Sequence, residues 1–234
     1  MTDNFNSYNS SAASDVYAQP IGLWSNEKIL ISYFFKNTAG KILILGCGGG
    51  RTVIPLIQIG YQITALDFSP KMINLTEEKL KQFNLTAKTV VGRAEDLSQF
   101  SEAEFDYVFF PFNGLDSISP LSQRLKCLTE IKRVLKPSGY LLYSTHNLFS
   151  CRHFINYLKS NKKPFVSEIS PYGQLTLYYA NPPFEIIRLK KIFSWTDIYS
   201  TRYLVRWFNK SANGWLFKWP TIFLSRFVYL IAQK

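Results

Sequence analysis

A run of glycines and a single acid, one strand apart, are the first residues in this sequence that could do chemistry. The run GCGGG at residues 46–50 directly follows the apolar segment 41–45. Glycines allow the backbone to turn sharply and to approach a ligand, because no Cβ intervenes. Asp67 ends the next apolar segment, and a carboxylate there can accept two hydrogen bonds from a ribose diol. Together these residues indicate a nucleotide-type ligand at the ends of two neighbouring strands.

Other interpretations of the glycine run are open. A P-loop ends in GK[ST], and this run does not. A dinucleotide-binding loop has glycine at its sixth place, which is Arg51 here. A ligand-free turn would explain the glycines alone, and an acid at a helix N-terminus would explain Asp67 alone. The two features at adjacent strand ends are harder to obtain by chance.

Few side chains could act as a general base, which a group-transfer reaction needs only if its acceptor must lose a proton. His146 follows the apolar segment 140–144 and is the better candidate, because an imidazole titrates near neutrality. A hydrogen bond to a loop is its alternative role. His153 is expected on the following helix in a structural role, and Asp116 in a turn or a helix cap.

These residues require a scaffold that brings strand ends together. Strands are expected at 41–45, 61–66, 86–91, 105–110, 140–144, 175–179, 196–200 and 227–232, and helices at 52–59, 69–83, 120–135 and 182–191. The alternation predicts right-handed crossovers and a doubly wound α/β sheet. In such sheets ligands bind outside the carboxyl ends of the strands, which is where the candidate residues fall.

The order of the motifs shows a resemblance to a known family. KILILGCGGG, ALDFSPKMI, VGRAEDL, FDYVFFPFNGL and EIKRVLKPSGYLLYSTHN, within residues 41–147, resemble the successive motifs of class I S-adenosylmethionine-dependent methyltransferases of the small-molecule type. The resemblance implies a Rossmann-like seven-stranded sheet with a reversed final hairpin near 196–201 and 226–232. It also implies S-adenosylmethionine as cofactor and methyl transfer as activity.

The resemblance assigns cofactor contacts to residues that follow the first four strands. They are Gly46, Cys47, Gly48 and Gly50 for the methionine part, Asp67 for the ribose, Phe68, Met72, Ala94 and Glu95 for the adenine, and Pro111, Phe112 and Asn113 for the methyl-donor end. Two positions depart from the family. Ile44 stands where an acid usually helps to order the loop, and Arg93 stands where Asp or Asn is common. Adenine recognition would then depend on the backbone and on Glu95 or Asp96.

The charge of the chain is concentrated in its C-terminal third. The net charge is +11, and residues 151–234 carry 13 Lys and Arg against 3 Asp and Glu, while residues 1–150 carry 14 against 13. The segment 202–226 interleaves tryptophans with cations. It could be a lid on the sheet, a wall for an acidic small substrate, or a surface for anionic lipid or nucleic acid, although no RNA-binding motif supports the last.

The rest of the sequence indicates how the chain is divided into segments and in which cellular compartment the protein is found. Residues 1–40 are interpreted as an N-terminal arm and first helix, 41–147 as the cofactor-binding core, and 148–234 as a substrate-side lid or insertion with the final strands. The arm is expected to be loose, although Tyr8, Tyr17 and Trp24 could close it over the pocket. No signal peptide or membrane span is expected. Three cysteines without CxxC spacing indicate a reducing cytoplasm and no zinc site.

The sequence therefore predicts a cytoplasmic, metal-independent methyltransferase acting on a small and, from the basic C-terminal third, acidic acceptor. Alternatives are methylation of RNA or of a lipid-linked substrate, a non-catalytic S-adenosylmethionine-binding protein, and a nucleotide-dependent oxidoreductase, against which Arg51 argues. The sequence does not indicate an oligomeric state.

Overall fold

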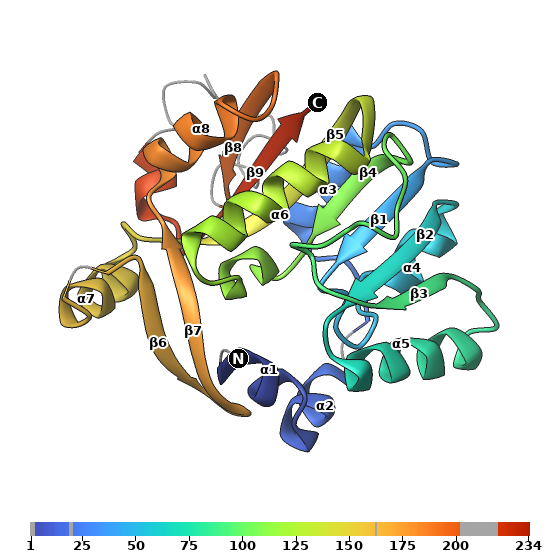
Figure 1. Cartoon of the computed structure of the whole chain (residues 1–234), viewed down its shortest axis with the longest axis horizontal. Coiled ribbons are helices and arrows are strands. Elements are labelled where there is room, and N and C mark those ends of the chain that lie inside the picture. The colour runs from blue at the N-terminus through green and yellow to red at the C-terminus, as the bar shows by residue number, and fades with distance from the viewer. Residues whose placement is uncertain (1–2, 19–20, 162, 202–219) are drawn as a thin grey trace.

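The computed structural model describes residues 3–18, 21–161, 163–201 and 220–234. Within these ranges, seven strands form the central sheet: β1 (Lys41–Leu45), β2 (Gln62–Asp67), β3 (Lys88–Val91), β4 (Phe105–Phe110), β5 (Leu135–Asn147), β8 (Trp195–Ser200) and β9 (Phe227–Gln233). The parallel strands run in the order β3-β2-β1-β4-β5, and β9 pairs antiparallel with both β5 and β8 (Figure 1). The expected doubly wound sheet and its reversed final hairpin are confirmed.

Helices cover both faces of this sheet because successive side chains of a strand point to opposite sides. Ile42 and Ile44 of β1 pack with α3 (Ser25–Phe34), α4 (Val53–Ile59) and α5 (Pro70–Gln82). Leu43 and Leu45 belong to the other core, with α6 (Leu121–Val134) and α8 (Pro182–Lys190). All four β1 side chains are fully buried, as expected for a parallel strand covered on both faces.

A hairpin that the sequence did not predict as a unit extends the sheet beyond the carboxyl end of β5. After α7 (Cys151–Lys159), β6 (Phe165–Ser170) and β7 (Gly173–Ala180) pair antiparallel. The end of β7 then pairs parallel with β5 at His146 and Asn147. This hairpin has a small core of its own, and Figure 1 shows it standing beside the carboxyl ends of the central strands.

The N-terminal arm is not loose: it forms α1 (Asp3–Tyr8) and α2 (Ser11–Ala18), so that expectation is wrong. Asn4 anchors it, because its Nδ2 donates to the carbonyls of Ser117 (3.0 Å) and Thr176 (2.9 Å). Its Oδ1 accepts from Thr176 N at 2.7 Å. A buried side-chain amide thus satisfies backbone groups of two distant segments, which fixes α1 against β7 (Figure 1).

Part of the basic, aromatic C-terminal segment lies outside the described residues. Residues 202–219 are not described, and they contain Arg206, Trp207, Lys210, Trp215, Lys218 and Trp219. Within the described residues, no helix has the length and apolar character needed to cross a membrane. The division of the chain at residues 40 and 147 stays a prediction.

Candidate functional site

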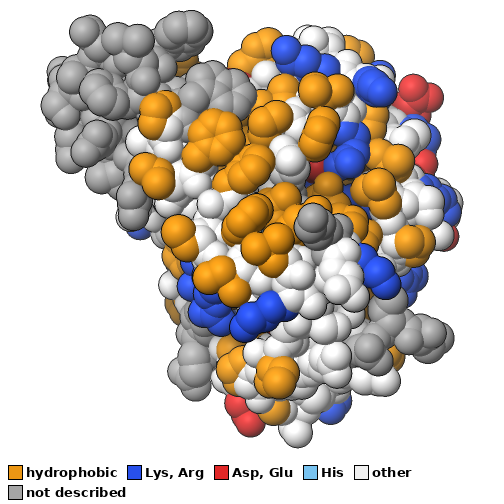
Figure 2. All heavy atoms as spheres, turned by 90° about the vertical axis from the view of Figure 1, so that its left-hand side faces the viewer, with side chains coloured by type: hydrophobic (Ala, Val, Ile, Leu, Met, Phe, Trp, Pro, Cys, Tyr) orange, Lys and Arg blue, Asp and Glu red, His pale blue; other side chains and the backbone are white. Residues whose placement is uncertain are grey.

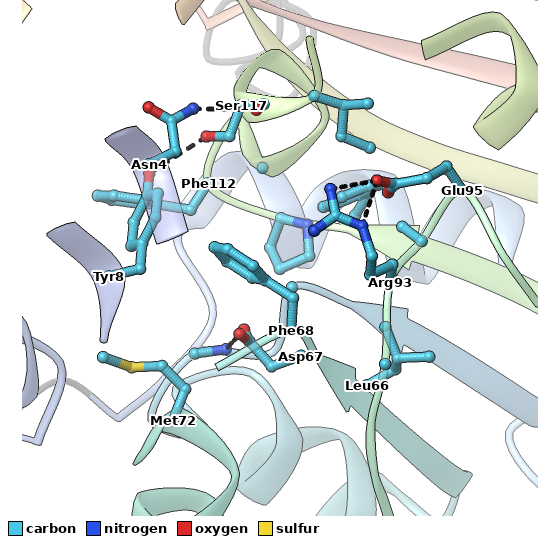
Figure 3. A pocket seen from close by; sticks show the side chains of 18 of the residues that line it. Asn4, Tyr8, Leu66, Asp67, Phe68, Met72, Arg93, Glu95, Phe112 and Ser117 are labelled. Atoms are coloured by element: carbon cyan, nitrogen blue, oxygen red, sulfur yellow. Dashed lines mark hydrogen bonds and ion pairs between the residues drawn. The ribbon is translucent and has the colours of Figure 1, made fainter. Parts of the chain in front are cut away.

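A pocket opens at the carboxyl ends of β1, β2 and β4, and side chains of α1 and α2 also line it (Figure 3). Nine of the predicted site residues line it: Gly46, Gly48, Asp67, Phe68, Met72, Ala94, Glu95, Pro111 and Phe112. Four predicted residues are not among those that line it: Cys47, Gly50, Asn113 and His146. The edge of the sheet at which the sequence places a ligand therefore carries a pocket, and the assignment of these residues to a cofactor stays a prediction.

The glycine loop needs glycine for two different reasons. Gly48 has φ +55°, a left-handed conformation that most side chains disfavour. At Gly49 a Cβ would lie 2.3 Å from the carbonyl oxygen of Tyr17, so any side chain would push α2 away. Cys47 points away from the pocket, since its Sγ lies 3.8 Å from Thr76 Oγ1 in the core. Its predicted cofactor contact can therefore come only from its backbone.

Asp67 is held at the mouth of the loop by two backbone donors. Gly48 N donates to its Oδ2 and Ser69 N to its Oδ1, both at 2.9 Å. The carboxylate is only 4% exposed, and burial raises its pKa to about 6 against the pull of these hydrogen bonds. A carboxylate has about four acceptor positions, so these two hydrogen bonds leave acceptor capacity toward the pocket that Asp67 lines.

The segment after the third strand contributes a short ion pair to the same pocket. Arg93 Nε donates to Glu95 Oε1 at 2.6 Å, and both residues line the pocket with Ala94 (Figure 3). Glu95 is buried, whereas more than half of the Arg93 side chain is exposed. The unexpected Arg93 thus neutralises Glu95, the acid to which adenine recognition was assigned. Asp96, the alternative acid, is exposed and does not line the pocket.

The loop after β4 is conformationally unusual at two consecutive residues. Phe112 has φ +54° and Asn113 has φ +56°, and neither is glycine. A non-glycine residue at positive φ is strained, and it keeps this conformation only where the surrounding structure imposes it. Here Ser144 Oγ accepts a hydrogen bond from Asn113 N at 2.9 Å. Asn113 Oδ1 is buried without a hydrogen-bond partner, so it is an acceptor that a ligand could satisfy.

Aromatic rings from the N-terminal helices form the wall of the pocket that faces Phe68. The Tyr8 ring lies 5.8 Å from the Phe68 ring in an edge-to-face arrangement. Tyr17 lies 6.0 Å from Phe112, and its hydroxyl is 3.1 Å from that of Tyr172 in the turn between β6 and β7. Tyr8 and Tyr17 therefore line the pocket, as expected from the sequence, whereas Trp24 does not. The hairpin contacts the arm through Tyr172 and does not line the pocket itself.

The departure at Ile44 has a structural explanation. Ile44 is fully buried in the core below α3 and α4, so no acid is directed to the loop from this position. Glu27 of α3, which was not predicted from the sequence, orders the loop from the other side. Its two carboxylate oxygens accept from Arg51 at 2.7 and 2.8 Å, and Trp24 N donates to it at 2.7 Å. An acid in the first turn of a helix was the only sequence signal for it.

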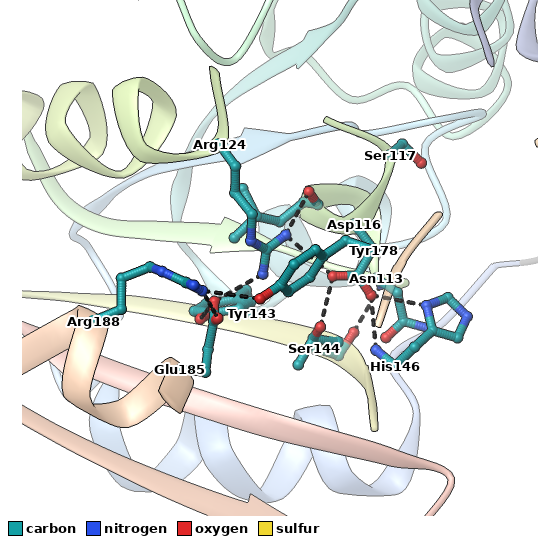
Figure 4. A network of polar contacts seen from close by, with 12 residues as sticks. Asn113, Asp116, Ser117, Arg124, Tyr143, Ser144, His146, Tyr178, Glu185 and Arg188 are labelled. Carbon is teal, nitrogen blue, oxygen red and sulfur yellow. Dashed lines mark hydrogen bonds and ion pairs between the residues drawn. The ribbon is translucent and has the colours of Figure 1, made fainter. Parts of the chain in front are cut away.

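A buried polar network lies behind the pocket (Figure 4). Arg124 of α6 is fully buried and pairs with Asp116 (3.2 Å) and Glu185 (2.9 Å), both of which are also fully buried. Tyr143 donates to Glu185 at 3.0 Å, and Arg188 pairs with the same carboxylate. Removing one member would leave a buried charge uncompensated. The network therefore fixes the short helix 114–117 against β5 and α8.

His146 is attached to this network and not to the pocket. Its backbone N and its ring Nδ1 lie 2.7 and 2.8 Å from Asp116 Oδ2 (Figure 4). The carboxylate requires Nδ1 to carry the proton, which leaves Nε2 as the acceptor. The ring packs 5.1 Å from His153 and 5.8 Å from Tyr179. Asp116 thus orients the imidazole, and the catalytic role of His146 stays a prediction.

His153 has the structural role expected for it. It is buried on α7, and its Nδ1 donates to Asn147 O at 2.9 Å. Burial lowers its pKa to about 4, so the imidazole is neutral at ordinary pH. Among the described residues, no group of three His, Cys, Asp or Glu side chains is placed to hold a metal ion.

Sequence comparisons connect this geometry to known proteins. Residues 42–139 match the family model of a methyltransferase domain. A putative methyltransferase of Bacillus subtilis, YqeM, is 27% identical over 112 residues, which cover 47% of this chain and 44% of that protein. A ubiquinone biosynthesis O-methyltransferase of Cereibacter sphaeroides is 30% identical over 107 residues, 46% of this chain and 41% of that protein. The aligned region spans less than half the length of these curated relatives.

Solved structures extend the likeness to nearly the whole chain. An S-adenosylmethionine-dependent methyltransferase from Methanosarcina mazei superposes with a TM-score of 0.70 at 19% identity, covering 92% of this chain and 99% of that one. The CcbJ methyltransferase from Streptomyces caelestis gives a TM-score of 0.66 at 16% identity, with 98% of each chain covered. These superpositions establish a common fold.

Proposed function

Because this chain belongs to the class I S-adenosylmethionine-dependent methyltransferases, we propose that it transfers a methyl group from that cofactor to a small acceptor bound beside Phe112 and Asn113. The observation that carries the proposal is Asp67: a buried carboxylate, held by two backbone donors, that lines a pocket at the end of β2. The cofactor, when bound, supplies a methyl group already activated by its sulfonium.

The residues present fit this cofactor. Gly46 and Gly48 line the pocket with backbone alone, and Asp67 would accept hydrogen bonds from the ribose hydroxyls. Phe68 and Met72 offer apolar surface for an adenine, with the Ala94 backbone at its edge. The backbones of Cys47 and Gly50 complete the turn for the methionine part, and Pro111 would meet the methyl-donor end. The protein's task is then to align donor and acceptor and to exclude water.

The described lining favours an acceptor with an apolar or aromatic body. Tyr8, Tyr17, Phe112 and Ile118 face the pocket, and its one described cation, Arg93, is already paired with Glu95. The expectation of an acidic acceptor therefore gains no support from the described lining. Asn113 Oδ1 is buried without a partner, and Asn113 does not line the pocket, so a hydrogen bond to a hydroxyl or amine of the acceptor would require that binding uncovers this atom.

His146 stays our proposed general base for an acceptor that must lose a proton. Asp116 holds the proton on Nδ1, so Nε2 would receive the acceptor's proton. Since His146 does not line the pocket, this proposal requires the acceptor to extend past Ser117 toward β5. The three cysteines are free, which agrees with the proposed cytoplasmic location. The competing hypotheses are an acceptor in RNA, an acceptor attached to lipid, and cofactor binding without catalysis.

Calorimetric titration of S-adenosylhomocysteine tests the cofactor site without knowledge of the acceptor. Asp67→Ala removes two charge-assisted hydrogen bonds, each contributing about 1.5–3 kcal/mol, so we expect affinity to fall by roughly 100-fold or more. Asp106→Ala is the matched control. Asp106 lies at the start of β4, at the other end of the strands, where it pairs with Lys136.

Each outcome has a separate meaning. Loss of affinity in Asp67→Ala, with affinity kept in Asp106→Ala, supports the site. Equal affinity in the wild type and Asp67→Ala would refute the assignment of the ribose to Asp67. Absence of binding to the wild-type protein would refute the proposed function itself.

A further inference from the structure

One face of the molecule gathers exposed apolar side chains from three segments that are distant in the sequence. These side chains, each between 39% and 63% exposed, are Phe154, Ile155 and Leu158 of α7, Phe184 and Ile187 of α8, and Phe223 and Leu224. We refer to this set as the α7–α8 face. Figure 2 shows the side of the molecule that carries α7, where apolar side chains gather among Lys and Arg side chains with few acidic ones.

Contacts show that the three segments adjoin. Tyr157 of α7 lines a groove together with Phe184 and Ile187 of α8. The Phe223 ring lies 5.1 Å from that of Phe149, which lies just before α7. Exposed apolar patches of this kind are uncommon on a protein surface that meets only water, and they mark interaction sites.

The orientation of α7 is set from its buried side. His153 is fully covered and bonded to Asn147 O, so the helix cannot turn to bury its outer residues. Ile155 and Leu158 follow at helical spacing on the side away from this contact, and they are 51% and 47% exposed. The helix thus presents an apolar face outward while its own packing is satisfied.

The charge around this face has one sign. Arg152, Lys159, Lys163, Lys190, Lys191 and Arg226 are exposed on or next to the three segments. Acidic side chains are few in the described residues from 148 onward, and none of them is exposed. Glu185 is fully buried in the network with Arg124, and Glu168 accepts hydrogen bonds from Tyr179 and Asn156. The face therefore combines apolar side chains with an excess of positive charge.

We propose that the α7–α8 face docks on an anionic lipid membrane surface. Phe154, Ile155 and Leu158 would enter the boundary between headgroups and acyl chains, and the surrounding cations would face acidic headgroups. Basic amphipathic helices bind membranes in this way. Lipid is favoured over nucleic acid because Ile155, Leu158, Ile187 and Leu224 are aliphatic and offer neither a stacking surface nor a phosphate contact. The proposal is independent of the acceptor and of methyl transfer.

Sedimentation of the full chain with vesicles tests the proposal. We expect binding to vesicles of phosphatidylcholine with about one third phosphatidylglycerol, weakened by salt, and little binding to phosphatidylcholine alone. Ile155→Glu/Leu158→Glu should weaken partitioning at least tenfold. Lys190→Gln/Lys191→Gln should weaken it by roughly fivefold for each charge removed.

A matched control carries the same charge change elsewhere. Ile59→Glu/Phe83→Glu replaces two apolar residues that are 47% and 43% exposed on α4 and at the end of α5, away from the face. This variant should show only the small effect of two added negative charges. Circular dichroism and thermal unfolding show that each variant is folded. This control does not depend on cofactor binding, so the test stays separate from that of the proposed function.

Several results would overturn the proposal. One is that the wild type does not bind anionic vesicles at all. Another is that Ile59→Glu/Phe83→Glu loses as much vesicle binding as Ile155→Glu/Leu158→Glu. Binding of single-stranded RNA that survives Ile155→Glu/Leu158→Glu while vesicle binding is absent would assign the charge to nucleic acid. A dimer that this variant dissociates, without vesicle binding by the wild type, would assign the face to a second copy of the chain.

Discussion

Cofactor affinity should depend on pH through Asp67. The perturbation is a change of pH from 8 to 5 in the wild-type protein. Burial raises the pKa of Asp67 to about 6, and the charged carboxylate is the stronger acceptor for two ribose hydroxyls. Because the pKa of Asp67 is about 6, the ligand-free protein takes up a proton on this carboxylate as the pH falls through 6. Binding, which favours the ionised form, should therefore weaken below that pH and be constant above about 7.

The size of the effect follows from the ionised fraction. With a pKa of about 6, roughly one tenth of Asp67 is ionised at pH 5 and nearly all of it at pH 8. Only protein with an ionised Asp67 is competent to bind, and the apparent affinity is proportional to the fraction of protein in this form. The dissociation constant should therefore be about tenfold higher at pH 5 than at pH 8. At pH 6, binding should release about half a proton for each ligand bound.

Calorimetry with S-adenosylhomocysteine measures both quantities, the second from the dependence of the binding enthalpy on the ionisation enthalpy of the buffer. Asp67→Asn is the control, because an amide does not titrate. Its affinity should be weak and independent of pH between 5 and 8. A wild-type dissociation constant that is flat across this range, or the same tenfold change in Asp67→Asn, would rule out Asp67 as the titrating group.

Three further predictions concern stability and the N-terminal arm. Arg124→Met should lower the free energy of unfolding by about 3–5 kcal/mol in urea titrations, because the buried carboxylates of Asp116 and Glu185 would lose the fully buried cation that they share. Lys136→Met, at a partly exposed pair, should cost about 1 kcal/mol or less. Gly49→Ala should speed hydrogen exchange in α2 but not in β1, since its Cβ would meet Tyr17 O; unchanged exchange would show that the loop adapts. His153 should titrate by NMR with a pKa of about 4, and a midpoint near 6.5 would mean that α7 opens in solution.

The central sheet could be predicted from the sequence because its signals are local. The strand KILIL and the run GCGGG are adjacent, and the Ser69 cap with Pro70 marks the start of α5. A short segment that is apolar at nearly every position indicates a parallel strand, since such a strand is buried on both faces. The order of the motifs then indicated which strand ends meet, and most of the residues predicted for the site do line one pocket.

The rest depends on partners that lie far away in the sequence. Asn4 bonds to Ser117 and Thr176, which are 113 and 172 residues distant, so nothing in the polar N-terminal stretch shows that it folds. The strand β6 alternates only weakly and gains its place by pairing with β7. Glu27 is a similar case, because its role follows from Arg51 on the other side of the loop. Tertiary contacts of this kind override local propensity.

The anchoring of Asn4 also has a consequence for the order in which the chain becomes structured. The first helix emerges early in synthesis, yet the edge of β7 that it must join is made only after about three quarters of the chain. Contacts of such sequence separation form late, because a long loop must close before they contribute. We therefore expect the pocket to acquire its cover last, after the sheet beneath it is complete. Ligand could then enter the nascent site before the arm docks, and a protein refolded without ligand would pass through a stage in which Asp67 faces open water.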